Sequence, residues 1–171
     1  GSIKRTGVYD QVMAQLAGTQ VWELGGVQPN PRLTLVREGI RLCHEHDIQL
    51  VLAVGGGSAI DTAKAVANGA CYDGDVWDLF DGKGRNTEVL PLGTVVTIPA
   101  AGSEMSDSCV ITREEDLCKR GRNTPLNFPK FSILNPEFTY TLPPFQTAYG
   151  VVDIMAHMME RYFTRVTHVE L

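Results

Sequence analysis

The chain has 171 residues, with 15 Lys and Arg against 20 Asp and Glu, so its formal net charge is −5. This length suits one domain, or one domain and the start of another. The hydrophobic content of 43% is ordinary for a folded protein. The acidic balance argues against a nucleic-acid binder or a protein of anionic membrane surfaces. We therefore expect neither kind of partner, and no apolar run approaches the roughly 20 residues that span a bilayer.

Apolar spacing predicts the first elements. A helix is expected over 8–16 and a short strand over 20–24. Asn30 is a suitable N-cap, and Pro31 suits the first position of the helix that follows and continues to 43. The four cysteines have no CxxC spacing and read as free thiols of a reducing compartment, which predicts a cytoplasmic location. They are Cys43, Cys71, Cys109 and Cys118.

The run 49–54 is apolar without alternation and ends on glycine, which is typical of a parallel strand covered on both faces. An alanine-rich helix is expected over 58–68, with Ser58 and Asp61 as a capping pair at its start. The polar, glycine-containing stretch 72–85 reads as a surface loop or a lid that Trp77 anchors.

Later elements continue the alternation of strands and helices. Strands are expected over 92–98, 108–112 and 130–134, a loop of small residues over 99–106, and a long helix over 145–163. This order predicts an α/β fold, Rossmann-like, with a mostly parallel sheet and helices on both of its faces. After Pro143 the pattern is helical only, so we expect an α/β domain over 1–143 and the beginning of an all-helical domain over 144–171.

The segment from Val54 to Ser58 joins a buried strand to a helix N-terminus through Gly55, Gly56 and Gly57. Glycines let the backbone approach a ligand closely, and the free amides and dipole of the helix favour an anion. The segment therefore predicts a diphosphate cradle, although a tight turn without a ligand has the same pattern. It is neither GxGxxG nor a P-loop.

Two further patterns are open from the residues alone. The start of the chain has two interpretations. Gly1 and Ser2 resemble the remnant of an expression tag, or they belong to a second glycine-serine turn where Lys4 and Arg5 face a phosphate. Asp153 and His157 are four residues apart, so a helix places both side chains on one face, where they can share a divalent cation. An ordinary surface contact between the two has the same spacing.

Together these patterns resemble the iron-containing alcohol dehydrogenases, in the branch of butanol dehydrogenases and aldehyde reductases. Six segments carry the resemblance in the family's order: Gly1–Gly7, Gly25–Pro31, Ala53–Asp61, Thr97–Glu104, Pro136–Pro143 and Gly150–His157. The resemblance implies a dinucleotide-binding α/β domain of the dehydroquinate synthase-like superfold, followed by a helical domain, with the active site between them.

The resemblance also implies site residues. The cofactor pyrophosphate would lie against Gly55, Gly56, Gly57 and Ser58, with Asp61 in the same loop. Thr97 and Ser106 would line the phosphate and nicotinamide region. Lys119 would lie near the nicotinamide ribose, Phe138 against the cofactor and Ser2 near the adenosine ribose. An acidic residue in the turn at Ser2 would repel the 2′-phosphate of NADP(H), but none is present there, and Lys4 and Arg5 are close by. NADP(H) is therefore favoured over NAD(H).

Asp153 and His157 match the first two of the family's four metal ligands, for Fe²⁺ or Zn²⁺. The other two are histidines further along the family's helical domain, and His168 matches neither. By this resemblance the chain is expected to lack the first strands and most of the helical domain. A polypeptide of these residues alone is therefore expected to be inactive.

The resemblance implies hydride transfer between NADP(H) or NAD(H) and a small primary alcohol or aldehyde. It also implies a homodimer or a larger oligomer, and no side chain of this segment is identified as the proton donor. Two alternatives are open. One is a glycerol dehydrogenase-like polyol dehydrogenase of the same superfold, and the other is a nucleotide-binding fragment without catalytic activity.

Overall fold

A computed structural model describes residues 2–164 and shows an α/β fold with a parallel sheet. Strands β1 (Val51–Gly55), β2 (Leu92–Val96) and β5 (Phe131–Ile133) form a three-stranded sheet in the order β1-β2-β5. Both pairings are parallel. All five residues of β2 are buried, as expected for the middle strand of such a sheet. The predicted parallel strands are confirmed.

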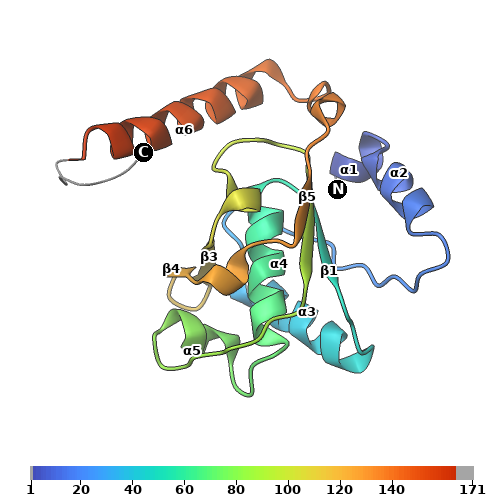
Figure 1. Cartoon of the computed structure of the whole chain (residues 1–171), viewed down its shortest axis with the longest axis vertical. Helices are drawn as coiled ribbons and strands as arrows, with labels where there is room; N and C mark the ends of the chain where they lie inside the picture. The colour runs from blue at the N-terminus through green and yellow to red at the C-terminus, as the bar shows by residue number, and fades with distance from the viewer. Residues whose placement is uncertain (1, 165–171) are drawn as a thin grey trace.

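Helix α4 (Gly57–Gly69) lies along the sheet, and α3 (Leu33–Glu45) packs against α4 (Figure 1). Small residues let the two helices approach each other closely. A Cβ atom added at Gly39 of α3 would lie 2.6 Å from Cγ2 of Val66. One added at Gly69 would lie 2.2 Å from Cδ1 of Ile40. The glycines are therefore needed for the tight contact that forms the centre of the main core.

Enlarging Gly39 tests this contact. Gly39→Leu is expected to lower the free energy of unfolding by about 1–3 kcal/mol, because the added side chain has no space beside Val66 and Leu24. Denaturant unfolding of purified protein measures the change. The matched control is Glu38→Leu, which adds the same side chain at the neighbouring exposed position. Equal stability of the two variants would contradict this account of the helix packing.

A second sheet was not predicted in full. Strand β3 (Ser108–Arg113) was expected, but β4 (Cys118–Asn123) was not, and the two form an antiparallel hairpin. The hairpin lies across α4 from the parallel sheet (Figure 1). β4 escaped prediction because its sequence, CKRGRN, is polar, and all but two of its residues are exposed. Its pairing with β3, rather than a buried face, makes it a strand.

Two expectations for the segment before α3 were wrong. Residues 20–24 form no strand in the described structure. Asn30 does not cap α3 but has a positive φ of 57°. The N-cap is Arg32 and the helix begins at Leu33, so Pro31 precedes the helix and is not its first residue. The chain stays extended through Arg32 because it bridges to Thr112 of β3, whose N–H donates to Pro31 O at 2.7 Å. This long-range pairing delays the start of the helix.

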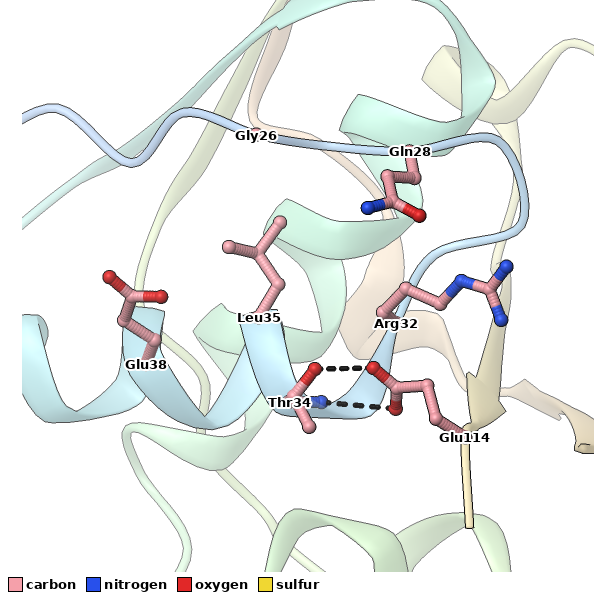
Figure 2. A pocket seen from close by; sticks show the side chains of 7 residues that line it. All are labelled: Gly26, Gln28, Arg32, Thr34, Leu35, Glu38 and Glu114. Carbon is pink, nitrogen blue, oxygen red and sulfur yellow. Dashed lines mark hydrogen bonds between the residues drawn. The ribbon is translucent and has the colours of Figure 1, made fainter. Parts of the chain in front are cut away.

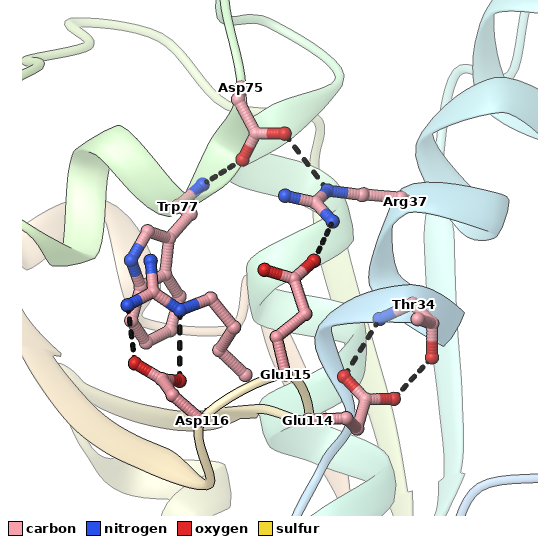
Figure 3. Close-up of polar contacts among 8 residues, drawn as sticks. Thr34, Arg37, Asp75, Trp77, Glu114, Glu115 and Asp116 are labelled. Carbon is pink, nitrogen blue, oxygen red and sulfur yellow. Dashed lines mark hydrogen bonds and ion pairs between the residues drawn. The ribbon is translucent and has the colours of Figure 1, made fainter.

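The stretch 72–85 is not a surface lid. It contains helix α5 (Val76–Phe80), most of which is buried, and Trp77 is only 4% exposed, so its predicted anchoring role is confirmed. Asp75 caps α5 by accepting from Trp77 N at 2.8 Å. The other carboxylate oxygen of Asp75 accepts from Arg37 Nε at 2.9 Å, which ties α5 to α3 (Figure 3). The Arg113 guanidinium stacks 4.7 Å from the Trp77 ring centroid.

The ends of the chain are helical. Helices α1 (Ser2–Arg5) and α2 (Val8–Gln15) precede α3, and α6 (Pro144–Tyr162) reaches away from the body of the molecule (Figure 1). Short 3-10 turns connect the later elements: η1 (Ser103–Met105), η2 (Pro125–Asn127) and η3 (Pro136–Thr139). Among residues 2–164, no helix has the length and apolarity to cross a membrane. The expectation on His168 lies outside the described residues.

Candidate functional site

The glycine segment lies at the carboxyl end of β1, as predicted. Gly55 ends the strand, Gly56 is the N-cap of α4, and Gly57 is the first residue of the helix. Ala59 N and Ile60 N both donate to Gly56 O, at 3.0 and 3.1 Å. Within the described residues no side chain caps this helix. The amides of Gly57 and Ser58 are therefore available to an anion, and the helix dipole favours one there.

Gly57 has an open side. A Cβ atom added there would have no described heavy atom within 4 Å, whereas one at Gly55 would lie 2.8 Å from the Ala59 Cβ. At Gly56 the nearest atom would be the Ile98 Cβ, at 3.3 Å. Gly55 and Gly56 are thus constrained by the protein's own packing. Gly57 leaves a space that a bound group can fill.

The predicted capping pair of Ser58 and Asp61 does not form. The Asp61 carboxylate instead accepts from Ser103 Oγ at 2.6 Å and from Val110 N at 3.1 Å. Burial raises the pKa of Asp61, while the hydrogen bonds from Ser103 and Val110 oppose that rise. The Asp61 side chain points toward the hairpin and makes these long-range hydrogen bonds in place of a local one at the helix start. Asp61 therefore joins α4 to β3 and does not cap α4.

Thr97 and Ser106 flank the loop that follows β2. Thr97 N donates to Gly55 O at 3.0 Å, which fixes the start of this loop beside the glycine segment. The Ser106 hydroxyl accepts from Ser108 N at 3.0 Å and so shapes its own turn. Both residues lie on the segment that leads from the parallel sheet to the hairpin.

The other predicted cofactor residues lie apart from this loop in the chain. Lys119 lies on β4, where its Nζ donates to Asn30 Oδ1 at 2.8 Å. Phe138 is in η3 and half-exposed, and Ser2 is in α1 and exposed. Asn30 was not predicted as a site residue. Its positive φ and its contact with Lys119 are the features that single it out.

Asp153 and His157 lie on α6, with Oδ1 and Nε2 3.7 Å apart. Asp153 also lines a cavity of about 290 Å³, whose other walls come from the loop after β2 and from α6. The lining residues are Ile98, Ala100, Gln146, Tyr149, Gly150 and Asp153. At Gly150 an added Cβ would lie 2.8 Å from Pro99 O, so glycine allows this close approach of helix and loop.

A carboxylate oxygen and an imidazole nitrogen one helical turn apart are a donor pair that a divalent cation accepts. The pair thus fits two positions of a metal site. No group of three or more His, Cys, Asp or Glu side chains in residues 2–164 is arranged to hold a metal. A complete site therefore needs ligands from elsewhere.

A second pocket, of about 420 Å³, lies at the start of α3 and holds none of the predicted site residues (Figure 2). Glu114 closes it by accepting from Thr34 N at 3.3 Å and from the Thr34 hydroxyl. Although burial acts to raise the pKa of Glu114, these hydrogen bonds hold it below its usual value. The carboxylate already satisfies the amide at this helix end.

Lys64 is a second residue that sequence reasoning missed. It lies on α4 one turn beyond Asp61 and is fully buried, at 0% exposure. A signal was present, because Asp61, Lys64 and Asn68 form a polar stripe on a helix otherwise rich in alanine and valine. The stripe faces the hairpin and η1, and that packing was not foreseen.

The fold defines a class: a Rossmann-like α/β protein with a glycine turn at the carboxyl edge of its parallel sheet. Residues 1–136 match the model of the family described as "Iron-containing alcohol dehydrogenase". The chain belongs to this family.

Known relatives fit the same branch. The chain is 53% identical over 170 residues to a probable NADH-dependent butanol dehydrogenase of Bacillus subtilis, covering 98% of this chain and 44% of the relative. It is 40% identical over 168 residues to the NADPH-dependent aldehyde reductase YqhD of Escherichia coli, covering 96% of this chain and 43% of that relative. The crystal structure of NADH-dependent butanol dehydrogenase A from Thermotoga maritima matches with a TM-score of 0.92 and 47% identity, over 95% of this chain and 42% of that one. The chain thus spans less than half of these relatives.

Proposed function

We propose that the whole protein transfers a hydride between a nicotinamide dinucleotide and a small primary alcohol or aldehyde, with the help of a divalent metal. The observation that carries this proposal is that one loop lies next to both the glycine cradle and Asp153. The loop that begins beside the glycine cradle also lines the cavity that contains Asp153. The names of the relatives support the same reaction class.

In this proposal the amides of Gly57 and Ser58 bind the pyrophosphate, with Gly55 and Gly56 shaping the turn. Thr97 and Ser106 line the path toward the nicotinamide. Lys119, held by Asn30, lies near the nicotinamide ribose. Phe138 contacts the cofactor, and Ser2 lies near the adenosine ribose. The protein's contribution to hydride transfer is mainly orientation of the two reactants.

Asp153 and His157 are proposed as two metal ligands, for Fe²⁺ or Zn²⁺, completed by ligands outside residues 2–164. A bound metal would act as a Lewis acid on the substrate oxygen. The family description names iron, and the donor pair suits either ion. His157 serves as a ligand here and is therefore not assigned as the proton donor.

The preference for NADP(H) is proposed from Lys4 and Arg5 of α1, which follow Ser2. Arg5 is exposed, but Lys4 Nζ donates to Glu23 Oε2 at 2.9 Å, so an acidic residue shares part of this basic surface. The relatives include NADH- and NADPH-dependent proteins. The ratio of kcat/KM for the two cofactors measures the preference, and a ratio in favour of NADH would overturn it.

The domain organisation is also a proposal. We place the α/β domain over 1–143 and the start of a helical domain over 144–171, because α6 begins at Pro144 and only Gly150 of it is buried. The exposed apolar side chains of α6 suit a helix that the rest of a helical domain covers. A homodimer or larger oligomer and a cytoplasmic location stay predictions.

The test uses the full-length natural protein that contains this chain. Its metal is removed with a chelator, and Fe²⁺ or Zn²⁺ is then added back. NADPH or NADH oxidation is measured with butanal, and the reverse reaction with butanol and glycerol. Metal-dependent reduction of butanal is the expected result. Oxidation of glycerol without turnover of butanal would instead support a polyol dehydrogenase. Dinucleotide binding without any turnover would leave a non-catalytic nucleotide-binding protein.

A further inference from the structure

The buried ammonium group of Lys64 is bound by three backbone carbonyls. Its Nζ donates to Ser103 O at 2.7 Å, to Ser106 O at 2.8 Å and to Ser108 O at 2.7 Å. All three donors of the ammonium are therefore used. A buried charge is costly unless it is fully hydrogen-bonded, so this arrangement holds the carbonyls firmly in place.

Asp61 binds the same segment from one turn earlier on α4. Its carboxylate accepts from Ser103 Oγ at 2.6 Å and from Val110 N at 3.1 Å. The two side chains thus attach η1 and the start of β3 to α4. This is the helix whose first residues form the glycine cradle. We call Asp61 and Lys64 with their partners the α4 clamp.

The loop that leads from β2 to the clamped segment forms one wall of the cavity that Asp153 lines. The loop after β2 is fixed at its start, where Thr97 N donates to Gly55 O at 3.0 Å, and at its end by the α4 clamp. Between these two points lie Ile98 and Ala100, which line the cavity opposite α6. The position of this wall relative to the cradle therefore depends on both attachments.

We infer that Lys64 is a positioning residue for hydride transfer, because it sets the distance between the cofactor cradle and the cavity wall opposite Asp153. This inference rests on the proposed function. Lys64 touches neither the cradle nor the cavity, so it acts through the segment from Ser103 to Ser108. Its loss is expected to misplace the reactants more than to weaken cofactor binding.

The test compares Lys64→Met with unmodified enzyme in the longest natural polypeptide that contains this chain. We expect kcat to fall by about 10- to 100-fold, the cost of a small misplacement of reactants. The primary isotope effect on kcat with 4-deuterated NAD(P)H is expected to rise toward its intrinsic value, because chemistry becomes rate-limiting. The dissociation constant of NAD(P)H, measured by fluorescence, is expected to change little.

The matched control is Asn68→Ala on the same helix. Asn68 is 2% exposed, and its Nδ2 donates to Asn127 Oδ1 at 2.8 Å, so its loss also disturbs buried hydrogen bonds. It holds η2 rather than the cavity wall. We expect this variant to lose stability without a change in the isotope effect. In Lys64→Ala, added propylammonium is expected to restore part of kcat by replacing the missing ammonium.

A readout without turnover separates the clamp from the proposed function. Hydrogen exchange of the amides over 100–108 is expected to accelerate in Lys64→Met but not in Asn68→Ala. If unmodified enzyme has no activity, the proposed function fails, and exchange alone decides whether the clamp exists. If Lys64→Met does not fold, Ser103→Ala loosens the same segment by removing its bond to Asp61. An unchanged kcat and isotope effect in the folded variant would overturn the inference.

Discussion

Gly57→Val is expected to weaken NAD(P)H binding about tenfold or more, which corresponds to about 1.4 kcal/mol. The reason is the open side of Gly57, where an added Cβ atom meets no described heavy atom within 4 Å. A branched side chain built on that atom would stand at the mouth of the proposed cradle. The fold should be little affected, because valine costs a helix less than glycine does. Titration of the cofactor's fluorescence with the full-length protein measures the change.

The matched control is Gly25→Val. Gly25 also has no described atom within 4 Å of an added Cβ, and it lies outside the helices and strands. We expect this variant to bind NAD(P)H as unmodified protein does. Unchanged cofactor affinity in Gly57→Val, with the protein folded, would show that the pyrophosphate does not lie at the start of α4.

The second large effect is expected at α6. Asp153→Asn should reduce both the bound metal and the rate of aldehyde reduction by on the order of 100-fold, because a neutral amide is a much poorer ligand than a carboxylate. Cofactor affinity should change far less, since the cradle lies at the start of α4. Metal analysis of the purified protein, together with steady-state kinetics, separates the two effects.

The control for this variant is Glu160→Gln, which removes a negative charge from the same exposed helix, three residues beyond His157. It should retain metal and activity. If both variants lost metal equally, the general charge of α6 would explain the result better than a specific ligand. Full metal content in Asp153→Asn would remove Asp153 from the site.

The sequence predicted those features that local patterns encode. The apolar runs of β1 and β2 and the glycines after β1 identified the parallel sheet and the strand-to-helix turn, because strand burial and turn chemistry leave a local pattern. The binding of a pyrophosphate at this turn stays a prediction. Asp153 and His157 were identified by helical spacing, and the structure confirms that they lie on one helix, with Asp153 in a cavity. Their role as metal ligands stays a prediction.

What the sequence did not predict depends on contacts between distant residues. Asp61 has the spacing of a cap but binds Ser103 and Val110, which are more than 40 positions away. β4 is polar and becomes a strand only through its pairing with β3. Lys64 would ordinarily be placed on the surface, and three carbonyls of the segment from Ser103 to Ser108 make its burial possible. Local propensity carries no information on any of these partners.

We propose that the loop after β2 lies between the pyrophosphate cradle at the start of α4 and the metal ligands on α6. A crystal structure of the full-length protein with NAD(P)H and its metal tests this claim most directly, with anomalous scattering recorded at the metal's absorption edge. The account predicts pyrophosphate density against the amides of Gly57 and Ser58, and an anomalous peak bound by Asp153 and His157. Pyrophosphate bound away from α4, or a metal that contacts neither side chain, would contradict it.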